Sequence, residues 1–277
     1  MDRVRLKGGV PAIPMVNLGP PPGSITDEQQ VGGAARGGNP YTLAGSDYER
    51  YRPAYLPAAV RAGLSGLSNS QVLDVGAGSG KFTRALVAQG IKVSALEPAA
   101  SMREMFRESL PQVPLFEGKA EDVADLFAPN TFDALCFAQS WHWVDREAAC
   151  AAAATVLKPG GRLVIIYNQM NVSFPWVKRL SRVMRSGDVH HPDRVPKVGK
   201  GFQKPELRLF QWGVSLPVTA LFALAKTRSS YLKASERGKQ HLQNNLQSYL
   251  LGDLALDPNQ TVTLPYYTLV WISPKIS

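Results

Sequence analysis

The stretch VLDVGAGSGKFT, residues 72–83, places three alternating glycines and a lysine between an apolar run and a segment with helical periodicity. A phosphate-binding P-loop needs a glycine five residues before its Gly-Lys pair and a Ser or Thr after it, but Val75 and Phe82 occupy these positions. A dinucleotide fingerprint needs a third glycine three residues after the second, where this chain has Lys81. Both interpretations therefore fail, and the rest of the chain has to indicate what the loop holds.

Around this loop, short apolar runs alternate with segments of helical periodicity, which is typical of β-α-β units and a parallel sheet. The expected strands are residues 71–76, 91–97, 113–118, 132–140 and 162–168, and the expected helices are 81–90, 101–110 and 146–157. The pattern predicts a doubly wound α/β fold. In such a sheet ligands bind outside the carboxyl ends of the strands, where the glycine loop lies.

After residue 170 the pattern is less regular. We expect a helix with a basic face at 178–185, followed by a polar loop at 186–205 and a strand at 207–212. Two helices at 217–226 and 235–251 and a final strand at 260–273 complete the chain.

Composition limits the class of protein. A chain of 277 residues with 44% hydrophobic content can bury one main core. Residues 1–40 contain eight glycines and six prolines, so we predict a disordered arm there. No apolar run approaches the roughly 20 residues that span a bilayer, which predicts a soluble protein. Cys136 and Cys150 are interpreted as small core residues that fit a cytoplasmic location, and no metal site is expected.

The net charge of +9 is unevenly distributed. Residues 171–277 hold fifteen Lys and Arg against six Asp and Glu, whereas the rest of the chain is nearly balanced. Such asymmetry fits either an anionic partner or a solvated basic surface. The candidates to face an acidic ligand are Lys178, Arg179, Arg182, Arg194, Lys197 and Lys200.

Asp74 and the alternating glycines become informative together with Glu97, which ends the second expected strand. A carboxylate at this place can accept both hydroxyls of a ribose, while glycines let the backbone approach a nucleoside closely. The helix that begins near Lys81 offers free N–H groups, which suit a carboxylate as well as a phosphate. A ligand that joins adenosine to an amino-acid end would use all of these features.

Five motifs occur in a fixed order along the chain: LDVGAGSGKFT, LEPAASM, GKAEDV, FDALCFAQSWHWVD and VLKPGGRLVI. This set resembles the class I S-adenosylmethionine-dependent methyltransferases, and more narrowly the type-11 domain group with its trans-aconitate-methyltransferase-like enzymes. The segment YERYRPAYLP is similar to that group's Tyr-x-x-x-Arg-Pro-x-Tyr-Pro, with Leu56 in place of a proline. The resemblance covers about residues 41–273. It implies a Rossmann-like, mostly parallel seven-stranded sheet in a domain from 41 to 277, with a helical cap from about 41–65 and 171–255.

The resemblance also implies which residues bind the donor S-adenosylmethionine. The glycine loop would line its methionyl and ribose part, Glu97 would bind the ribose hydroxyls, and Asp74 would act through a water or orient the loop. The complete set of expected donor-binding residues is Asp74, Gly76, Ala77, Gly78, Glu97, Pro98, Met102, Ala120, Glu121 and Gln139.

Acceptor-side candidates follow the fourth expected strand, where the resemblance places the substrate. Trp141 and Trp143 would contact the acceptor, and His142 would remove its proton, since an unperturbed pKa near 6.5 suits this work. The alternative for His142 is a hydrogen-bonded histidine in the pocket wall. Tyr48 and Arg52 would bind substrate in a segment that closes over the donor, or would only pack on the sheet.

The expected function is methyl transfer from S-adenosylmethionine to a small molecule, with an acidic acceptor favoured if the basic residues face the pocket. One alternative is a donor-binding cyclase or binding scaffold that transfers no methyl group, because donor motifs report binding and not turnover. Another is methylation of nucleic acid. The absence of interleaved aromatic residues and of an Asn-Pro-Pro-Tyr-like motif argues against that second alternative. The identity of the acceptor and the oligomeric state do not follow from the sequence.

Overall fold

The computed structural model describes residues 51–67 and 69–276. The predicted disordered arm and Tyr48 lie outside the described residues. The chain divides into two compact units. We call residues 53–169, 189–211 and 267–276 the sheet unit, and residues 51–52, 170–188 and 212–266 the helical unit.

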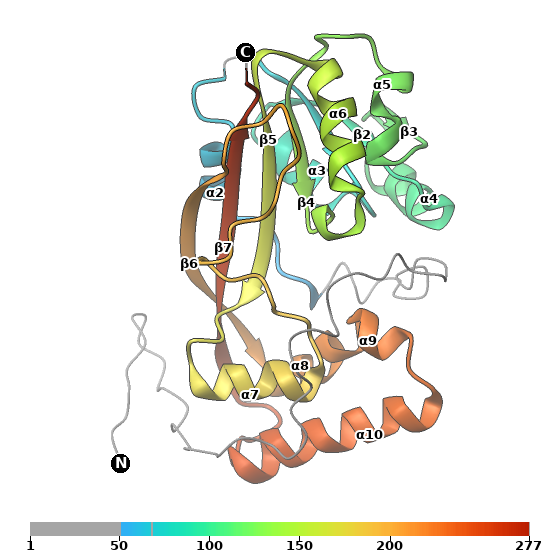
Figure 1. Ribbon diagram of the computed structural model, residues 1–277. Helices are drawn as coiled ribbons and strands as arrows, with labels where there is room; N and C mark the ends of the chain where they lie inside the picture. The colour runs from blue at the N-terminus through green and yellow to red at the C-terminus, as the bar shows by residue number, and fades with distance from the viewer. Residues whose placement is uncertain (1–50, 68, 277) are drawn as a thin grey trace. The chain divides into compact units, whose positions relative to one another are not determined.

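The strands form one seven-stranded sheet in the order β3-β2-β1-β4-β5-β7-β6, which confirms the predicted fold class (Figure 1). Their bounds are β1 Gln71–Val75, β2 Lys92–Leu96, β3 Leu115–Phe116, β4 Phe132–Ala138, β5 Leu157–Met170, β6 Glu206–Pro217 and β7 Thr261–Pro274. The pairs β1 with β2, β2 with β3, β1 with β4 and β4 with β5 are all parallel.

The chain changes direction across the sheet between β1 and β4. From β1 it adds β2 and β3 on one side, and it then returns to place β4 and β5 on the other. Leu73 pairs with Leu135 in this central ladder, and both side chains are fully buried. Because helices cover both faces of a parallel sheet, such strands are apolar throughout. The loops that leave β1 and β4 therefore meet at the reversal point, where open α/β sheets bind ligands.

Within the described residues, the sheet unit has one helix before β1, and its other helices connect the strands (Figure 1). The helices are α2 Pro57–Gly63, α3 Lys81–Val87, α4 Ala100–Ser109, α5 Val123–Leu126 and α6 Arg146–Val156, with short 3₁₀ turns η3 Ala120–Asp122 and η4 Trp141–Trp143. Asp145 begins α6, because its carboxylate accepts the N–H groups of Glu147 and Ala148. This cap fixes the point at which the chain leaves the carboxyl end of β4.

The helical unit has its own core. Its helices are α7 Pro175–Met184, α8 Val218–Lys226, α9 Ser229–Leu232 and α10 Glu236–Gln247, which continues as the π-helix η5 Ser248–Asp253. Figure 1 shows α7 and α10 side by side. Leu180 and Leu246 are fully buried, and Tyr249 donates a hydrogen bond of 2.8 Å to the carbonyl of Trp176. Burial of one apolar face explains why these polar helices are stable.

The structure differs from the sequence expectation at the start of β5. The Lys-Pro-Gly-Gly motif was expected to separate helix from strand, yet β5 begins at Leu157 and includes the motif. The pairing with β4 is irregular there, and Gly160 has a φ of 76° that suits glycine. The motif therefore forms a bulge within the strand.

No helix in residues 51–67 and 69–276 is long and apolar enough to cross a membrane. The same residues contain no cluster of His, Cys, Asp or Glu that could hold a metal ion. Cys136 and Cys150 are both buried and unbridged, as core cysteines were predicted to be.

Candidate active site

The site is centred on the reversal point of the sheet, where Gly76 after β1 meets Ser140 after β4. A Cβ built on Gly76 would lie 2.7 Å from the Cβ of Ser140. The hydroxyl of Ser140 donates a hydrogen bond of 2.6 Å to the carbonyl of Val75. The two loops are therefore locked together, and only glycine fits at position 76.

The glycine loop takes a left-handed path. Gly76, Gly78 and Gly80 have φ values of 72°, 59° and 89°, which side chains rarely adopt. The N–H groups of Gly76 and Ala77 both bond to the carbonyl of Leu96, which holds the loop against β2. Within the described chain, no heavy atom lies within 4 Å of a Cβ added at Gly78. The loop thus presents bare backbone to open space at this residue.

Glu97 ends β2 as predicted, and its carboxylate is already engaged. One oxygen accepts the N–H of Gly78 at 2.8 Å, and the other accepts the N–H of Ala99 at 2.9 Å. Burial raises the pKa of Glu97, and these two hydrogen bonds oppose that change. Each oxygen keeps a second lone pair that could accept a ribose hydroxyl. Glu97 therefore also sets the position of the glycine loop.

Arg103 of α4 supports this corner of the site, and sequence reasoning missed it. Its guanidinium donates to the carbonyls of Glu97 and Pro98 at 3.1 and 2.7 Å and pairs with the Glu117 carboxylate at 2.7 Å. The side chain is buried, and its charge opposes the rise in the pKa of Glu97. In the sequence, the only indication that Arg103 lies near Glu97 is the spacing of six residues between them.

Asp74 is fully buried inside β1 and lies behind the glycine loop. One carboxylate oxygen accepts the hydroxyl of Thr83 at 2.6 Å, which ties β1 to the first turn of α3. Within the described residues the other oxygen has no hydrogen-bond partner. Burial raises the pKa of Asp74 to about 7, and the nearby charge of Glu97 adds to the rise. A carboxyl group in this state can donate or accept a proton near neutral pH.

The remaining donor-binding candidates lie in the same unit. Pro98 is exposed, whereas Met102 on α4 and Ala120 in η3 are buried. The carboxylate of Glu121 accepts the N–H of Asp145 at 2.6 Å, so it fastens the start of α6 to η3. The assignment of adenine contacts to these residues stays a prediction.

Gln139 has a strained backbone at the end of β4. Its φ of 60° is rare for a residue with a side chain, and such strain is concentrated at functional sites. Its side-chain amide donates to the carbonyl of Asn168 at 2.7 Å. Asn168 in turn accepts the hydroxyl of Thr268 at 2.6 Å and donates to the carbonyl of Ala54 at 3.2 Å. Asn168, which sequence reasoning did not select, thereby joins four segments around the site.

Four rings gather at the carboxyl ends of β4 and β5, and we call His142, Trp143, Tyr167 and His190 the ring cluster. Tyr167 and His190 stack with their centroids 3.6 Å apart and their planes at 9°. The ring of His142 lies 5.0 Å from that of Trp143 and 5.7 Å from that of His190. His190 lies in the segment 186–205, which was expected to be a polar loop, and the structure shows that its ring is half-buried.

His142 is exposed, yet the rings of Trp143, Tyr167 and His190 lie within 6.3 Å of its own ring. Desolvation of the imidazole lowers the pKa of His142 from 6.5 to about 4. The imidazole is therefore neutral at physiological pH. It can accept a hydrogen bond or a proton, although its low pKa makes it a weak base.

The other acceptor-side candidates differ in their burial and in the unit to which they belong. Trp141 packs in the core, with its indole N–H bonded to the carbonyl of Lys197 at 3.1 Å, whereas Trp143 is 49% exposed. Arg52 belongs to the helical unit, where its guanidinium donates to the side chain and carbonyl of Thr227 at 3.1 and 2.9 Å. The substrate-binding roles assigned to these residues stay predictions.

Comparisons with known proteins agree on the class. The sequence profile of a methyltransferase domain family matches residues 73–165. An uncharacterized methyltransferase of Mycobacterium tuberculosis is 34% identical over 223 residues, which cover 80% of this chain and 90% of that protein. One from Schizosaccharomyces pombe is 29% identical over 209 residues, covering 72% of this chain and 82% of the relative.

Solved structures share the fold. A protein from Anaeromyxobacter dehalogenans described as a type II methyltransferase aligns with a TM-score of 0.59 at 21% identity. The alignment covers 80% of this chain and 97% of that one. The chain belongs to the class I S-adenosylmethionine-dependent methyltransferases, in the group with the type-11 domain. It is thus an enzyme, and S-adenosylmethionine is its methyl donor.

Proposed function

We propose that the enzyme methylates a small-molecule acceptor that carries an acidic group. The observation that carries this proposal is the placement of the ring cluster beside the reversal point of the sheet. The glycine loop and Glu97 stand at the ends of β1 and β2, while His142 and Tyr167 stand at the ends of β4 and β5. In this topology a donor and an acceptor can meet above adjacent strand ends.

The residues around the glycine loop fit S-adenosylmethionine. The open space at Gly78 suits close approach of the backbone to the donor, and the carboxylate of Glu97 suits a ribose. The buried second oxygen of Asp74 has no partner in the described chain and could accept a hydrogen bond from a water or from the amino end of the donor. We propose that these three residues hold the donor, together with Ala77, Met102, Ala120 and Gln139.

Bound S-adenosylmethionine supplies a methyl group activated by its sulfonium. The protein has to align the acceptor with that group, and alignment alone can lower the barrier by roughly 7–11 kcal/mol. The strained backbone of Gln139 and the ring cluster are suited to this positioning. His142, held neutral, would take the acceptor's proton or accept its hydrogen bond, which adds about 10² to 10⁴-fold when a base is needed.

An acidic acceptor is supported by the excess of basic residues after position 170. The structure narrows the six candidates, because Arg179 pairs with Asp253 at 3.1 Å in the helical unit and Lys197 lines a pocket of the sheet unit. Lys178 and Arg182 are exposed on α7. Arg194, Lys197 and Lys200 are exposed as well, and we select Lys197 because it alone of the six lines the pocket.

The experiment is an acceptor screen. The full chain is incubated with S-adenosylmethionine and small acidic and neutral metabolites, and mass spectrometry detects S-adenosylhomocysteine together with a product that has gained one methyl group. We expect an acidic compound to be methylated. Glu97→Ala serves as the variant with impaired donor binding.

Two other outcomes would favour the alternatives. Donor binding without acceptor-dependent S-adenosylhomocysteine would favour a scaffold or cyclase. Methylation of RNA or DNA together with strongly salt-dependent binding would favour a nucleic-acid substrate.

A further inference from the structure

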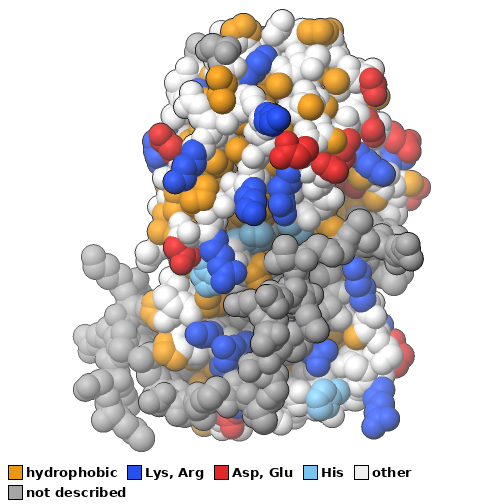
Figure 2. All heavy atoms as spheres, viewed as in Figure 1, with side chains coloured by type: hydrophobic (Ala, Val, Ile, Leu, Met, Phe, Trp, Pro, Cys, Tyr) orange, Lys and Arg blue, Asp and Glu red, His pale blue; other side chains and the backbone are white. Residues whose placement is uncertain are grey.

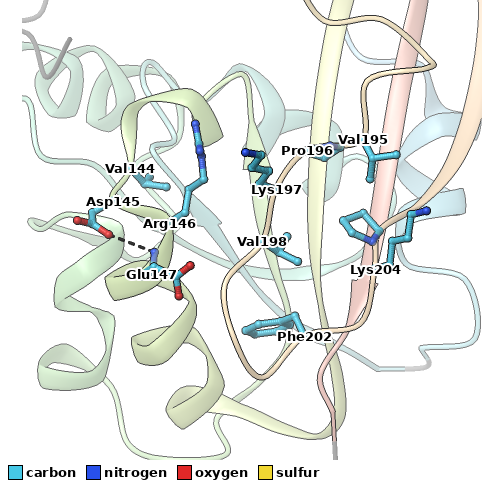
Figure 3. A pocket seen from close by; sticks show the side chains of 11 residues that line it. Val144, Asp145, Arg146, Glu147, Val195, Pro196, Lys197, Val198, Phe202 and Lys204 are labelled. Atoms are coloured by element: carbon cyan, nitrogen blue, oxygen red, sulfur yellow. Dashed lines mark hydrogen bonds between the residues drawn. The ribbon is translucent and has the colours of Figure 1, made fainter. Parts of the chain in front are cut away.

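A pocket of about 780 Å³ opens in the sheet unit beside the start of α6. Figure 3 shows its walls, which come from three short segments. They are residues 144–147, 195–198 and the group Phe202, Lys204 and Pro205. No residue of the predicted donor site lines it, so the pocket is separate from the glycine loop.

Two of the three basic side chains of the pocket extend toward the same edge. Figure 3 shows the side chains of Arg146 and Lys197 extending toward the same edge, whereas Lys204 points away from them. Two cations at one edge of a pocket repel each other, and an anion bound between them removes this repulsion. Arginine in particular can hold a carboxylate or phosphate with two parallel hydrogen bonds.

The two acidic residues of the pocket, Asp145 and Glu147, lie at the start of α6. The carboxylate of Asp145 caps α6 by accepting two backbone N–H groups. The carboxylate of Glu147 lies against Gly199, since a Cβ added to that glycine would be 3.0 Å from one of its oxygens. Within residues 51–67 and 69–276, neither carboxylate forms a hydrogen bond or an ion pair with Arg146 or Lys197.

The rest of the lining is apolar. Val144, Val195, Val198 and Phe202 contribute side chains, and Phe202 belongs to the main core of the sheet unit. A pocket with apolar walls and a few charged groups at one edge is suited to a ligand with an apolar body and one charged end. Such a ligand would bury hydrocarbon against these side chains while its anion stays at the basic edge.

The pocket adjoins the ring cluster. The carbonyl of Lys197 accepts the indole N–H of Trp141, which precedes His142 in η4. The charge of Arg146 acts on the hydroxyl of Tyr167, where it opposes the rise in pKa that burial causes. Figure 2 shows Lys and Arg side chains directly beside His side chains on this face of the molecule.

We infer that this pocket binds the anionic end of an amphipathic acceptor, with Arg146 and Lys197 as its carboxylate- or phosphate-binding pair. The inference rests on the proposed function, because it assigns the pocket to the acceptor. An acid bound at the basic edge would extend its apolar part along Val144 toward the ring cluster. Arg146 and Lys197 thereby determine specificity for an acid over its neutral analogue.

The test compares phenylacetate with phenylacetamide, which have the same shape and differ in charge. Calorimetric titration of the full chain should show phenylacetate binding at least tenfold more tightly than the amide. The double variant Arg146→Gln with Lys197→Gln should bind both compounds equally. Arg208→Gln, which removes an exposed arginine of the same unit, should keep the full preference.

Thermal unfolding of each variant confirms that the fold is intact, and Arg146→Lys should retain part of the preference because it keeps the charge. The inference is overturned if the wild type binds neither compound, if it does not discriminate between them, or if the double variant still does. Donor affinity is measured in the same preparations. If the donor binds normally but the acid is not preferred, the assignment of the pocket as an anion site is wrong and the proposed function still stands. If the acid is preferred but the donor does not bind, the proposed function is wrong and the anion site still stands.

Discussion

Gly76 and Ser140 are in contact across the reversal point of the sheet, because a Cβ added at position 76 would lie 2.7 Å from the Cβ of Ser140. The contact joins the loop after β1 to the loop after β4. Since we propose that the donor is held by the first loop and that the acceptor lies beyond the second, this contact would set how far apart the two ligands lie.

We expect Gly76→Ala to destabilise the protein by about 3 kcal/mol and to weaken donor binding. A side chain at positive φ costs about 1–2 kcal/mol, and crowding against Ser140 adds a similar amount. Gly78→Ala is the matched control, because it has positive φ but open space around the new Cβ. It should cost only about 1 kcal/mol in urea unfolding. Equal losses for the two variants would show that the contact with Ser140 is unimportant.

The sequence was sufficient for the sheet and for the place of Glu97 at the end of β2, because alternating apolar and helical periods and the glycine loop are local signals. It could not reveal the stack of His190 on Tyr167, since these residues come from a polar loop and from a strand whose approach depends on the tertiary fold. The same holds for Asn168, whose four-way contacts involve segments as far apart as Ala54 and Thr268. Lys197 was selected for its charge, but Arg146 was not, because the charge excess lies elsewhere in the chain.

Glu97→Ala should weaken S-adenosylmethionine binding by about 1.5 kcal/mol or more, roughly tenfold. The change removes the proposed acceptor for the ribose hydroxyls and also frees the N–H of Gly78. Calorimetry with S-adenosylhomocysteine measures the loss. Unchanged affinity would show that Glu97 does not bind the ligand.

Glu97→Gln separates the two roles of this side chain. An amide has one acceptor oxygen, so it can hold either the N–H of Gly78 or that of Ala99 but not both. We expect an intermediate affinity with nearly normal thermal stability. A loss as large as that of the alanine variant would indicate that the charge itself is required.

Asp74→Asn should flatten the dependence of stability on pH. The pKa of Asp74 is raised from 3.8 to about 7 by burial, so folding favours the neutral acid. The corresponding stability is complete below about pH 4 and is lost as the pH rises toward 7, by an amount on the order of 4 kcal/mol. Between pH 5 and 8 the wild type should therefore lose stability relative to the variant. Urea unfolding curves that stay parallel over this range would contradict the raised pKa.

His142 provides the last prediction, which concerns activity rather than stability. Because burial lowers its pKa to about 4, kcat/KM should show no limb near pH 6.5 that depends on this residue. His142→Gln should reduce kcat/KM by at least tenfold if the imidazole meets the acceptor, while donor affinity remains unchanged. His241→Gln, on the exposed face of α10, controls for loss of a histidine in general. A limb near pH 6.5 in the kcat/KM profile that disappears in His142→Gln would show that the imidazole is well solvated. A loss of kcat/KM smaller than twofold in this variant would assign His142 to the wall of the site.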